Sequence, residues 1–270
     1  MLKTTMQCIV VFNLVQCSYM SWSIRRQFTI ITVLIVAIAV PIIYFGFIFL
    51  YKPATCFDGK QNGGENGVDC GGACSLICKK EAFDPLVLWQ RAFEVVDGEY
   101  NLIAYVENVN TDAGSKDTKY TFNMYDKDNN LVSSKKGFVS IPPRSIIPIT
   151  EDNIVFDGDI KRISFELEDL IWKKEATSDP LIVVTNEKLT NEDKEPRIDA
   201  LLQNVIFKSI DNIKVVAIVY DIDNNAIGTS STFINSISKD SAKNVTFTWP
   251  KPFSSDPVRF EIVPLYEIPR

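Results

Sequence analysis

One short motif occurs twice in this chain, and this repetition constrains the fold more than any other feature. YDKDNN occupies 125–130 and YDIDNN occupies 220–225, so their tyrosines lie 220 − 125 = 95 positions apart. Other identical residues recur at the same offset: Asp84 and Asp179, Pro85 and Pro180, Leu86 and Leu181, Ile103 and Ile198, Lys119 and Lys214, Phe138 and Phe233, Phe165 and Phe260, Glu166 and Glu261, Leu170 and Leu265. One offset that holds from end to end predicts a tandem duplication of a domain of about 95 residues.

The duplication predicts two domains in series. We expect β-sandwich repeat 1 at 84–175 and β-sandwich repeat 2 at 179–270, joined by the polar linker 173–180. β-rich stretches such as NLIAYVENV and IKVVAIVYD alternate with turn-forming clusters such as DKDNN and DIDNN. Units of this size and strand spacing favour an antiparallel β-sandwich. The repeated motif is expected to be a hairpin turn, because Asp and Asn bond to local backbone and tolerate positive φ; a calcium site at its aspartates is the alternative.

A long apolar stretch lies near the N-terminus. Residues 29–50 read TIITVLIVAIAVPIIYFGFIFL and contain no charge. At a rise of 1.5 Å each, these 22 residues cover about 33 Å, enough to cross the apolar core of a bilayer. Pro41 is tolerated in a membrane helix, and the aromatic residues at the far end resemble an interfacial belt. We predict a transmembrane helix at 29–51.

The charges beside this helix predict its orientation. Arg25 and Arg26 directly precede it, which places 1–28 in the cytoplasm and everything after Tyr51 outside. Cleavage as a signal peptide is disfavoured, because the apolar stretch is long and bulky aromatics occupy the place of a small-residue cleavage site. We therefore expect a signal anchor and a single-pass protein of the cell membrane.

The first residues leave alternatives open. The stretch CIVVFNLVQC is apolar but too short to span a bilayer. The sequence from Met20 already resembles a complete start of a signal anchor, so both Met1 and Met20 are candidate translation starts. A lipoprotein signal ending at Cys17 is a weaker alternative, because Gln16 is not the small residue that such a site needs.

Four of the six cysteines, Cys56, Cys70, Cys74 and Cys78, fall within one short Gly-rich segment, 54–80. Outside the cytoplasm such a cluster predicts two disulfides, with three possible connectivities. The segment is too small to form a hydrophobic core, so cross-links would supply its stability.

Metal binding is the alternative for this segment. The spacing C-x13-C-x3-C-x3-C lacks the CxxC knuckles typical of zinc sites. Four side chains with oxygen ligands lie among its glycines and are candidates for calcium: Asp58, Asn62, Glu65 and Asp69. A polar, turn-rich loop explains the same residues, and we expect no cofactor.

The segment resembles a short cysteine module found in many exported bacterial proteins. The shared pattern is C-x-DG-x-QNG-x-E-x-GVDCGG-x-C, which matches from Cys56 to Cys74. This resemblance implies export and disulfides, and it implies no particular activity.

The repeats resemble the immunoglobulin-like, FxLyD-like domains of bacterial envelope proteins. That family carries an N-V-x-N…YD-x-x-N/G pattern, matched in the first repeat by Asn108, Val109 and Asn110 with the motif at 125–130. The second repeat has Asn204 and Val205 with the motif at 220–225, and departs at Ile206. The predicted fold class is therefore mainly β: an N-terminal transmembrane helix, a small disulfide-rich segment, and two tandem immunoglobulin-like β-sandwich domains.

Composition narrows the functions. The chain has no histidine, which removes the commonest general base and metal ligand, and it carries no nucleotide-binding, hydrolase or metalloprotease motif. Its net charge of −6 argues against nucleic acid as a partner. We expect a non-enzymatic stalk or binding module of the bacterial cell envelope, with the membrane and other envelope proteins or surface polymers as partners. The alternative is an accessory subunit of an envelope secretion or pilus system.

Overall fold

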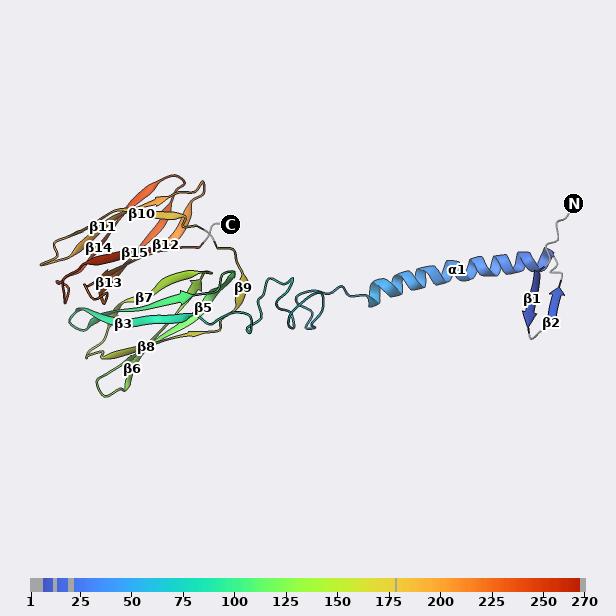
Figure 1. Cartoon of the computed structure of the whole chain (residues 1–270), viewed down its shortest axis with the longest axis horizontal. Coiled ribbons are helices and arrows are strands. Elements are labelled where there is room, and N and C mark those ends of the chain that lie inside the picture. The colour runs from blue at the N-terminus through green and yellow to red at the C-terminus, as the bar shows by residue number, and fades with distance from the viewer. Residues whose placement is uncertain (1–6, 12–13, 19–21, 178, 268–270) are drawn as a thin grey trace. The chain divides into compact units, whose positions relative to one another are not determined.

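The helix predicted near the N-terminus is present and begins earlier than expected. The computed structural model describes residues 7–11, 14–18, 22–177 and 179–267, and the chain divides into two units, Met1–Thr55 and Cys56–Arg270. In the first unit, α1 (Trp22–Leu50) has 29 residues and starts seven residues before the apolar stretch (Figure 1). None of its residues is buried, and its length and composition suffice to cross a membrane.

A short antiparallel hairpin, β1 (Gln7–Val11) and β2 (Leu14–Ser18), precedes this helix. The sequence analysis did not predict it, because two five-residue strands give little periodic signal. The possible starts at Met1 and Met20 lie outside the described residues, and the cytoplasmic location of 1–28 stays a prediction.

The second unit is built from strands. They are β3 (Leu86–Val96), β4 (Glu99–Asn108), β5 (Ala113–Tyr125), β6 (Leu131–Ile141), β7 (Ser145–Val155), β8 (Arg162–Glu168), β9 (Trp172–Lys174), β10 (Ile182–Thr190), β11 (Arg197–Asn204), β12 (Ile210–Tyr220), β13 (Ala226–Ile237), β14 (Ala242–Thr248) and β15 (Arg259–Leu265). With α1 and the disulfide-bonded segment described below, they confirm the predicted fold class: mainly β, in sandwiches, with an N-terminal apolar helix.

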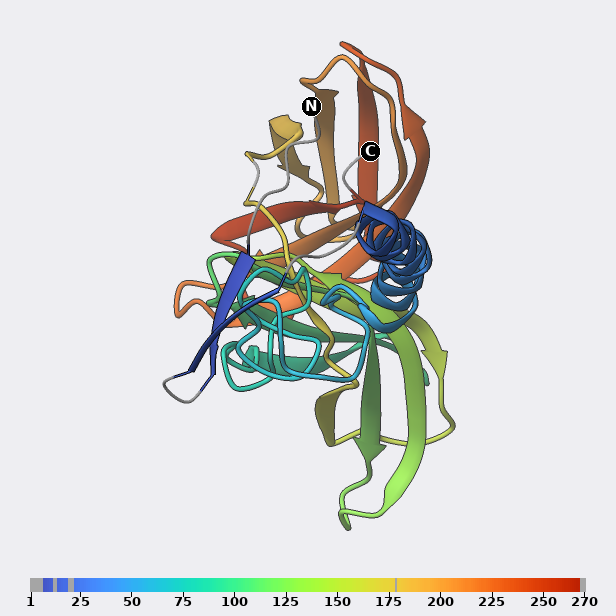
Figure 2. The same ribbon diagram turned by 90° about the vertical axis from the view of Figure 1, so that its right-hand side faces the viewer.

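These strands form two sandwiches, each with an outer and an inner sheet. The first sandwich has the outer sheet β6-β5-β8, with β9 also paired to β5, and the inner sheet β3-β4-β7. The second has the inner sheet β13-β12-β15 and the outer sheet β10-β11-β14. Figure 1 shows the two inner sheets next to each other, and Figure 2 shows the orange-to-red strands of the second sandwich above the green strands of the first.

The two inner sheets pack face to face. Along β4, Leu102 and Ala104 point into the core of the first sandwich, whereas Ile103 belongs to a different cluster. Along β12, Val215 and Ala217 point into the core of the second sandwich, whereas Val216 and Ile218 join Ile103. Successive strand residues face opposite sides, so these clusters place three apolar layers between four sheets. We call the middle layer, between the two inner sheets, the seam.

The seam explains the sequence of the inner strands. Almost every residue of β12 from Ile213 to Tyr220 is buried, and β4 is buried over most of its length. A strand buried on both faces reads as a continuous apolar run, because it has no solvent face to alternate with.

Both copies of the repeated motif are hairpin turns. Asp126 donates its backbone N–H to the Asn130 carbonyl, and Asp221 donates in the same way to Asn225. The side chains of both aspartates accept backbone N–H groups two and four residues further on. Asn129 has φ +63° and lies in the left-handed region, which asparagine tolerates well.

The pairing register of the two hairpins around these turns is also the same. Lys119 pairs with Phe138, and Lys214 pairs with Phe233, in agreement with the offset of 95. Each middle strand carries a register shift just before its final tyrosine.

The offset of 95 does not relate equivalent residues outside these two hairpins. Asn108 and Asn204 each donate to the carbonyl of a strand-end residue, Ala113 and Ile237, and each accepts the N–H two residues further on. The two asparagines therefore correspond, which gives an offset of 204 − 108 = 96. Ile198 therefore corresponds to Leu102, and both lie in sandwich cores. Ile103 lies in the seam, because a one-residue shift turns a side chain to the other face of the sheet.

In the strands that follow the two hairpins, the offset between equivalent residues changes again. Arg162 pairs with Tyr125 and Arg259 pairs with Tyr220, and each guanidinium lies over its tyrosine ring at 4.0 and 3.9 Å. This gives an offset of 259 − 162 = 97. Three of the identical pairs at offset 95 therefore do not occupy equivalent positions in the two sandwiches: Phe165 and Phe260, Glu166 and Glu261, and Leu170 and Leu265.

Candidate functional site

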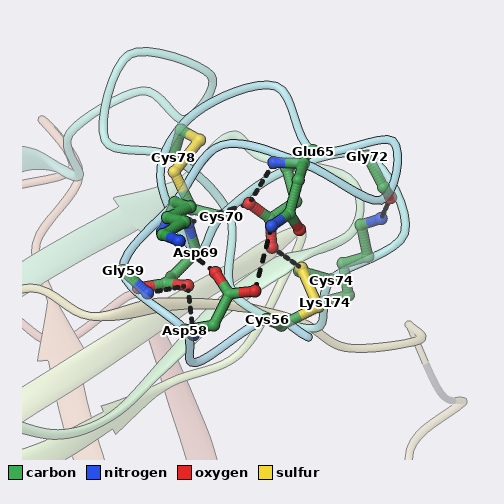
Figure 3. Close-up of a disulfide and its surroundings, with 12 residues drawn as sticks. Cys56, Asp58, Gly59, Glu65, Asp69, Cys70, Gly72, Cys74, Cys78 and Lys174 are labelled. Atoms are coloured by element: carbon green, nitrogen blue, oxygen red, sulfur yellow. Dashed lines mark hydrogen bonds between the residues drawn. A yellow bond between two sulfur atoms is a disulfide. The ribbon is translucent and has the colours of Figure 1, made fainter. Parts of the chain in front are cut away.

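The four clustered cysteines form two disulfides. Cys56 is bonded to Cys74 and Cys70 to Cys78 (Figure 3), one of the three connectivities that the sequence left open. The sulfurs are therefore not free as thiolates, which is the form in which cysteine binds zinc.

The four calcium candidates lie together but bond mainly to amide groups. Asp69 accepts the backbone N–H of Asp58 at 2.9 Å and that of Gly59 at 3.0 and 3.1 Å. Asp58 accepts the side-chain amide of Asn62 at 2.9 Å, and Glu65 accepts the backbone N–H of Asn62 and of Asp69. Glu65 Oε1 also lies 3.3 Å from Cys74 Sγ, a disulfide sulfur with no proton to donate (Figure 3). The contacts account for these side chains as loop stabilisers, and calcium binding stays the alternative interpretation of the same residues.

The disulfide segment is attached to the first sandwich. Ile77 donates its N–H to the Trp172 carbonyl at 2.9 Å, and Lys174 donates its backbone N–H to Ser75 at 2.8 Å. The Lys174 ammonium donates to the Gly72 carbonyl, and Trp172 is buried beside this junction. The sequence analysis missed this attachment, since β9 has three residues and too little pattern to be recognised.

The disulfides give a direct test in solution. Mass spectrometry of the unreduced, proteolysed protein is expected to yield peptides linked Cys56–Cys74 and Cys70–Cys78, with no alkylated thiol at these positions. The control is the same digest after reduction, in which all four are alkylated. Linked peptides of any other pairing would contradict the described fold of the segment.

Polar contacts also join the two sandwiches across the seam. The Tyr105 hydroxyl donates to Glu261 at 2.7 Å, and the Lys214 ammonium donates to the Thr150 carbonyl at 2.8 Å. Further bonds cross it from Arg91 to the Ala226 carbonyl and the Asn225 side chain, from Asn101 to the Thr229 carbonyl, and from Ser231 to Asp152. Buried polar groups that are hydrogen-bonded across an interface fix its register as well as its stability. The two sandwiches are thus held in one arrangement.

The seam shifts the acid–base behaviour of the groups inside it. Burial lowers the pKa of Lys214, and the nearby carboxylates of Asp152 and Glu151 oppose this effect. Burial raises the pKa of Tyr105 far above 10, and the hydrogen bond to Glu261 adds to it. Burial and the charge of Glu261 raise the pKa of Tyr220 to about 12.

These tyrosines predict a loss of stability at alkaline pH. A folded pKa above the unfolded value of 10 favours the protonated form in the fold, so this stabilisation is complete below pH 10 and is lost as the pH rises toward 12. Urea unfolding at increasing pH is expected to show this fall, with a smaller slope for Tyr220→Phe. An absorbance titration in which every tyrosine ionises near pH 10 would contradict the burial of these hydroxyls.

A cavity of about 620 Å³ lies at one end of the seam. Its walls come from both sandwiches and from the connecting residues, and most are apolar: Phe138, Ile146, Ile147, Pro180, Ile262 and Leu265. Its polar groups include Lys214 and the ion pair of Lys116 with Glu175, 3.2 Å apart. A concave apolar site with a few polar groups, at a contact between two domains, is the usual form of a ligand-binding site.

The sequence analysis did not identify this cavity or the seam residues around it. One signal was available: Lys214 interrupts the apolar run of β12, and a lysine in such a strand marks a special environment. The signal is weak, because the same pattern fits an exposed strand end.

Comparisons with known proteins identify no family. No protein-family profile matches the chain, and no curated protein matches it. Among solved structures, red sea bream transglutaminase is 12% identical and matches 71% of this chain and 32% of its own, with a TM-score of 0.24. The exo-chitosanase CsxA of Amycolatopsis orientalis is 8% identical (62% and 25% covered, TM-score 0.19), and a β-glucuronidase from glycoside hydrolase family 2 is 11% identical (78% and 29%, TM-score 0.22). The chain spans a third or less of each of these proteins, and TM-scores this low carry no argument about its activity.

Proposed function

We propose that this protein is a membrane-anchored, extracytoplasmic binding module without enzymatic activity. α1 crosses the membrane, residues 1–28 are cytoplasmic, and the second unit lies outside. The observation that carries the proposal is the close succession of two features: a 29-residue apolar helix with no buried residue, and two disulfides that begin six residues after it. An apolar helix whose residues are not buried by protein needs an apolar solvent, and disulfides persist in oxidising compartments.

The arrangement of the sandwiches supports a binding module more than a stalk. A stalk gains reach by joining domains end to end, whereas these sandwiches pack through their inner sheets and gain a cavity instead. The cavity at the seam is the binding site we propose, with an envelope protein or surface polymer as the source of its ligand.

We also infer that the two sandwiches are copies of one immunoglobulin-like domain. The matching hairpin registers, the two Asp turns and the two arginine–tyrosine pairs support this duplication. Offsets that change from 96 to 95 to 97 are what small insertions and deletions in loops after a duplication would leave.

A reporter enzyme that is active only outside the cytoplasm tests the topology. Fused after Arg270, it is expected to be active in cells. The matched control is the same fusion carrying Arg25→Glu and Arg26→Glu, in which the loss of the positive charges should lower activity. An inactive reporter on a stable, membrane-inserted protein would overturn the proposal.

A further inference from the structure

Several large apolar side chains at one end of the second unit are largely exposed within the part of the chain that the structure describes. Phe83 is 71% exposed and Phe207 is 83% exposed, and Val109 and Val205 are each more than 40% exposed. Phe57, next to a disulfide cysteine, is 86% exposed. Single exposed apolar residues are ordinary in proteins, but a group of them at one end marks an interaction surface.

Hydrogen bonds place these residues at the same end. Phe83 is bonded through its backbone to the side chain of Asn110, which directly follows Val109. Thr177 donates to the Thr111 carbonyl, and Leu181, four positions further, accepts the N–H of Val205.

Phe57 belongs to the same end. Lys174 binds Ser75 of the disulfide segment, and the next residue, Glu175, binds Asp112 beside the Val109 loop. We call these five residues, Phe57, Phe83, Val109, Val205 and Phe207, the apolar end.

The chain length identifies the surface that lies within reach. Only residues 51–55 connect α1 to Cys56, and five residues extend to at most about 18 Å. The disulfide segment is bonded to the first sandwich at this end, so the same short connection limits how far Cys56, at the start of that segment, can lie from the last residue of α1. If α1 is a membrane span, its last residue lies at the boundary between lipid and water, where aromatic side chains are stabilised.

We propose that the apolar end rests on the membrane surface, with Phe57, Phe83 and Phe207 in contact with lipid. This proposal depends on the membrane anchor of the proposed function. It specifies the partner of this surface as the lipid bilayer that holds the same chain's own helix.

Photo-crosslinking in the full chain tests the contact. A photoreactive phenylalanine analogue is introduced singly at Phe57, Phe83 or Phe207, and the protein is reconstituted in vesicles of phosphatidylcholine and phosphatidylglycerol. The matched control is Ile222, which is 76% exposed and lies in the loop at the opposite end of β12 from Phe207. The 11 residues of β12 separate the two positions by about 36 Å.

Lipid adducts are expected at Phe57, Phe83 and Phe207 and to be several-fold weaker at Ile222. Equal labelling of Phe207 and Ile222, or adducts with protein in place of lipid at the apolar end, would overturn the proposal. Extraction at alkaline pH separates this failure from that of the proposed function. A chain released from the vesicles refutes the anchor, whereas a retained chain without lipid adducts refutes only the contact.

Discussion

Replacing Asn204 with alanine is expected to lower the free energy of unfolding by about 3 kcal/mol. The Asn204 side chain is fully buried, donates to the Lys208 and Ile237 carbonyls at 2.8 and 3.0 Å, and accepts the N–H of Ile206. Alanine would remove all of these bonds, including the buried one to the Ile237 carbonyl, and a buried group that loses its partner costs about 1–3 kcal/mol. Urea unfolding of the full chain in detergent measures the change.

Two further variants show whether the loss of stability comes from the hydrogen bonds of a buried asparagine. Asn108→Ala removes the corresponding contacts in the first sandwich and should cost a similar amount. Asn244→Ala lies on an exposed face of β14 and should change stability by about 0.5 kcal/mol or less. Equal, small effects of all three would show that the buried asparagines do not organise the loops as described.

Replacing Ile103 with aspartate is expected to destabilise the protein by about 4 kcal/mol. Ile103 is fully buried in the seam beside Val216 and Ile218, so the substitution places a carboxylate among apolar groups. The cation on the neighbouring strand, Arg91, lies opposite Ile103 and already donates to the Ala226 carbonyl and the Asn225 side chain. The sandwich cores on either side do not contain Ile103, so the loss reports on the contact between the sandwiches. The same urea unfolding experiment measures it.

Leu131→Asp is the matched control for this substitution. Leu131 is 57% exposed on β6, at the outer sheet of the first sandwich, so a carboxylate there stays in water and should cost little. If Ile103→Asp were as mild as Leu131→Asp, Ile103 would be exposed to solvent and the inner sheets would not be packed together.

Local signals in the sequence predicted the elements that depend on local physics. The apolar stretch at 29–50 predicted α1, because a helix with no buried residue carries its whole pattern in its own residues. The Asp–Asn motifs predicted the two turns, because their hydrogen bonds are made within five residues. The cysteine cluster predicted two disulfides but not their pairing, since pairing depends on the path of the backbone between them.

The seam was not predicted, because its signal is spread over two domains. Ile103 and Val216 look like ordinary core residues of separate sandwiches, and only the three-dimensional arrangement shows that they face each other. The assumption of a single offset made this harder to see. It paired Ile103 of the seam with Ile198 of a sandwich core. These two side chains lie on opposite faces of their sheets, because a shift of one residue moves a side chain to the other face.

The cavity and the proposed binding module both depend on the face-to-face packing of the sandwiches, and a double-mutant cycle across the seam tests it most directly. Tyr105→Phe and Glu261→Ala each remove the 2.7 Å hydrogen bond that joins the first sandwich to the second, and the double variant completes the cycle. A coupling energy of about 1 kcal/mol or more is expected, because a hydrogen bond to a charged group contributes about 1.5–3 kcal/mol. Effects that add within about 0.5 kcal/mol would mean that the two side chains do not meet, and would contradict the packing on which this account rests.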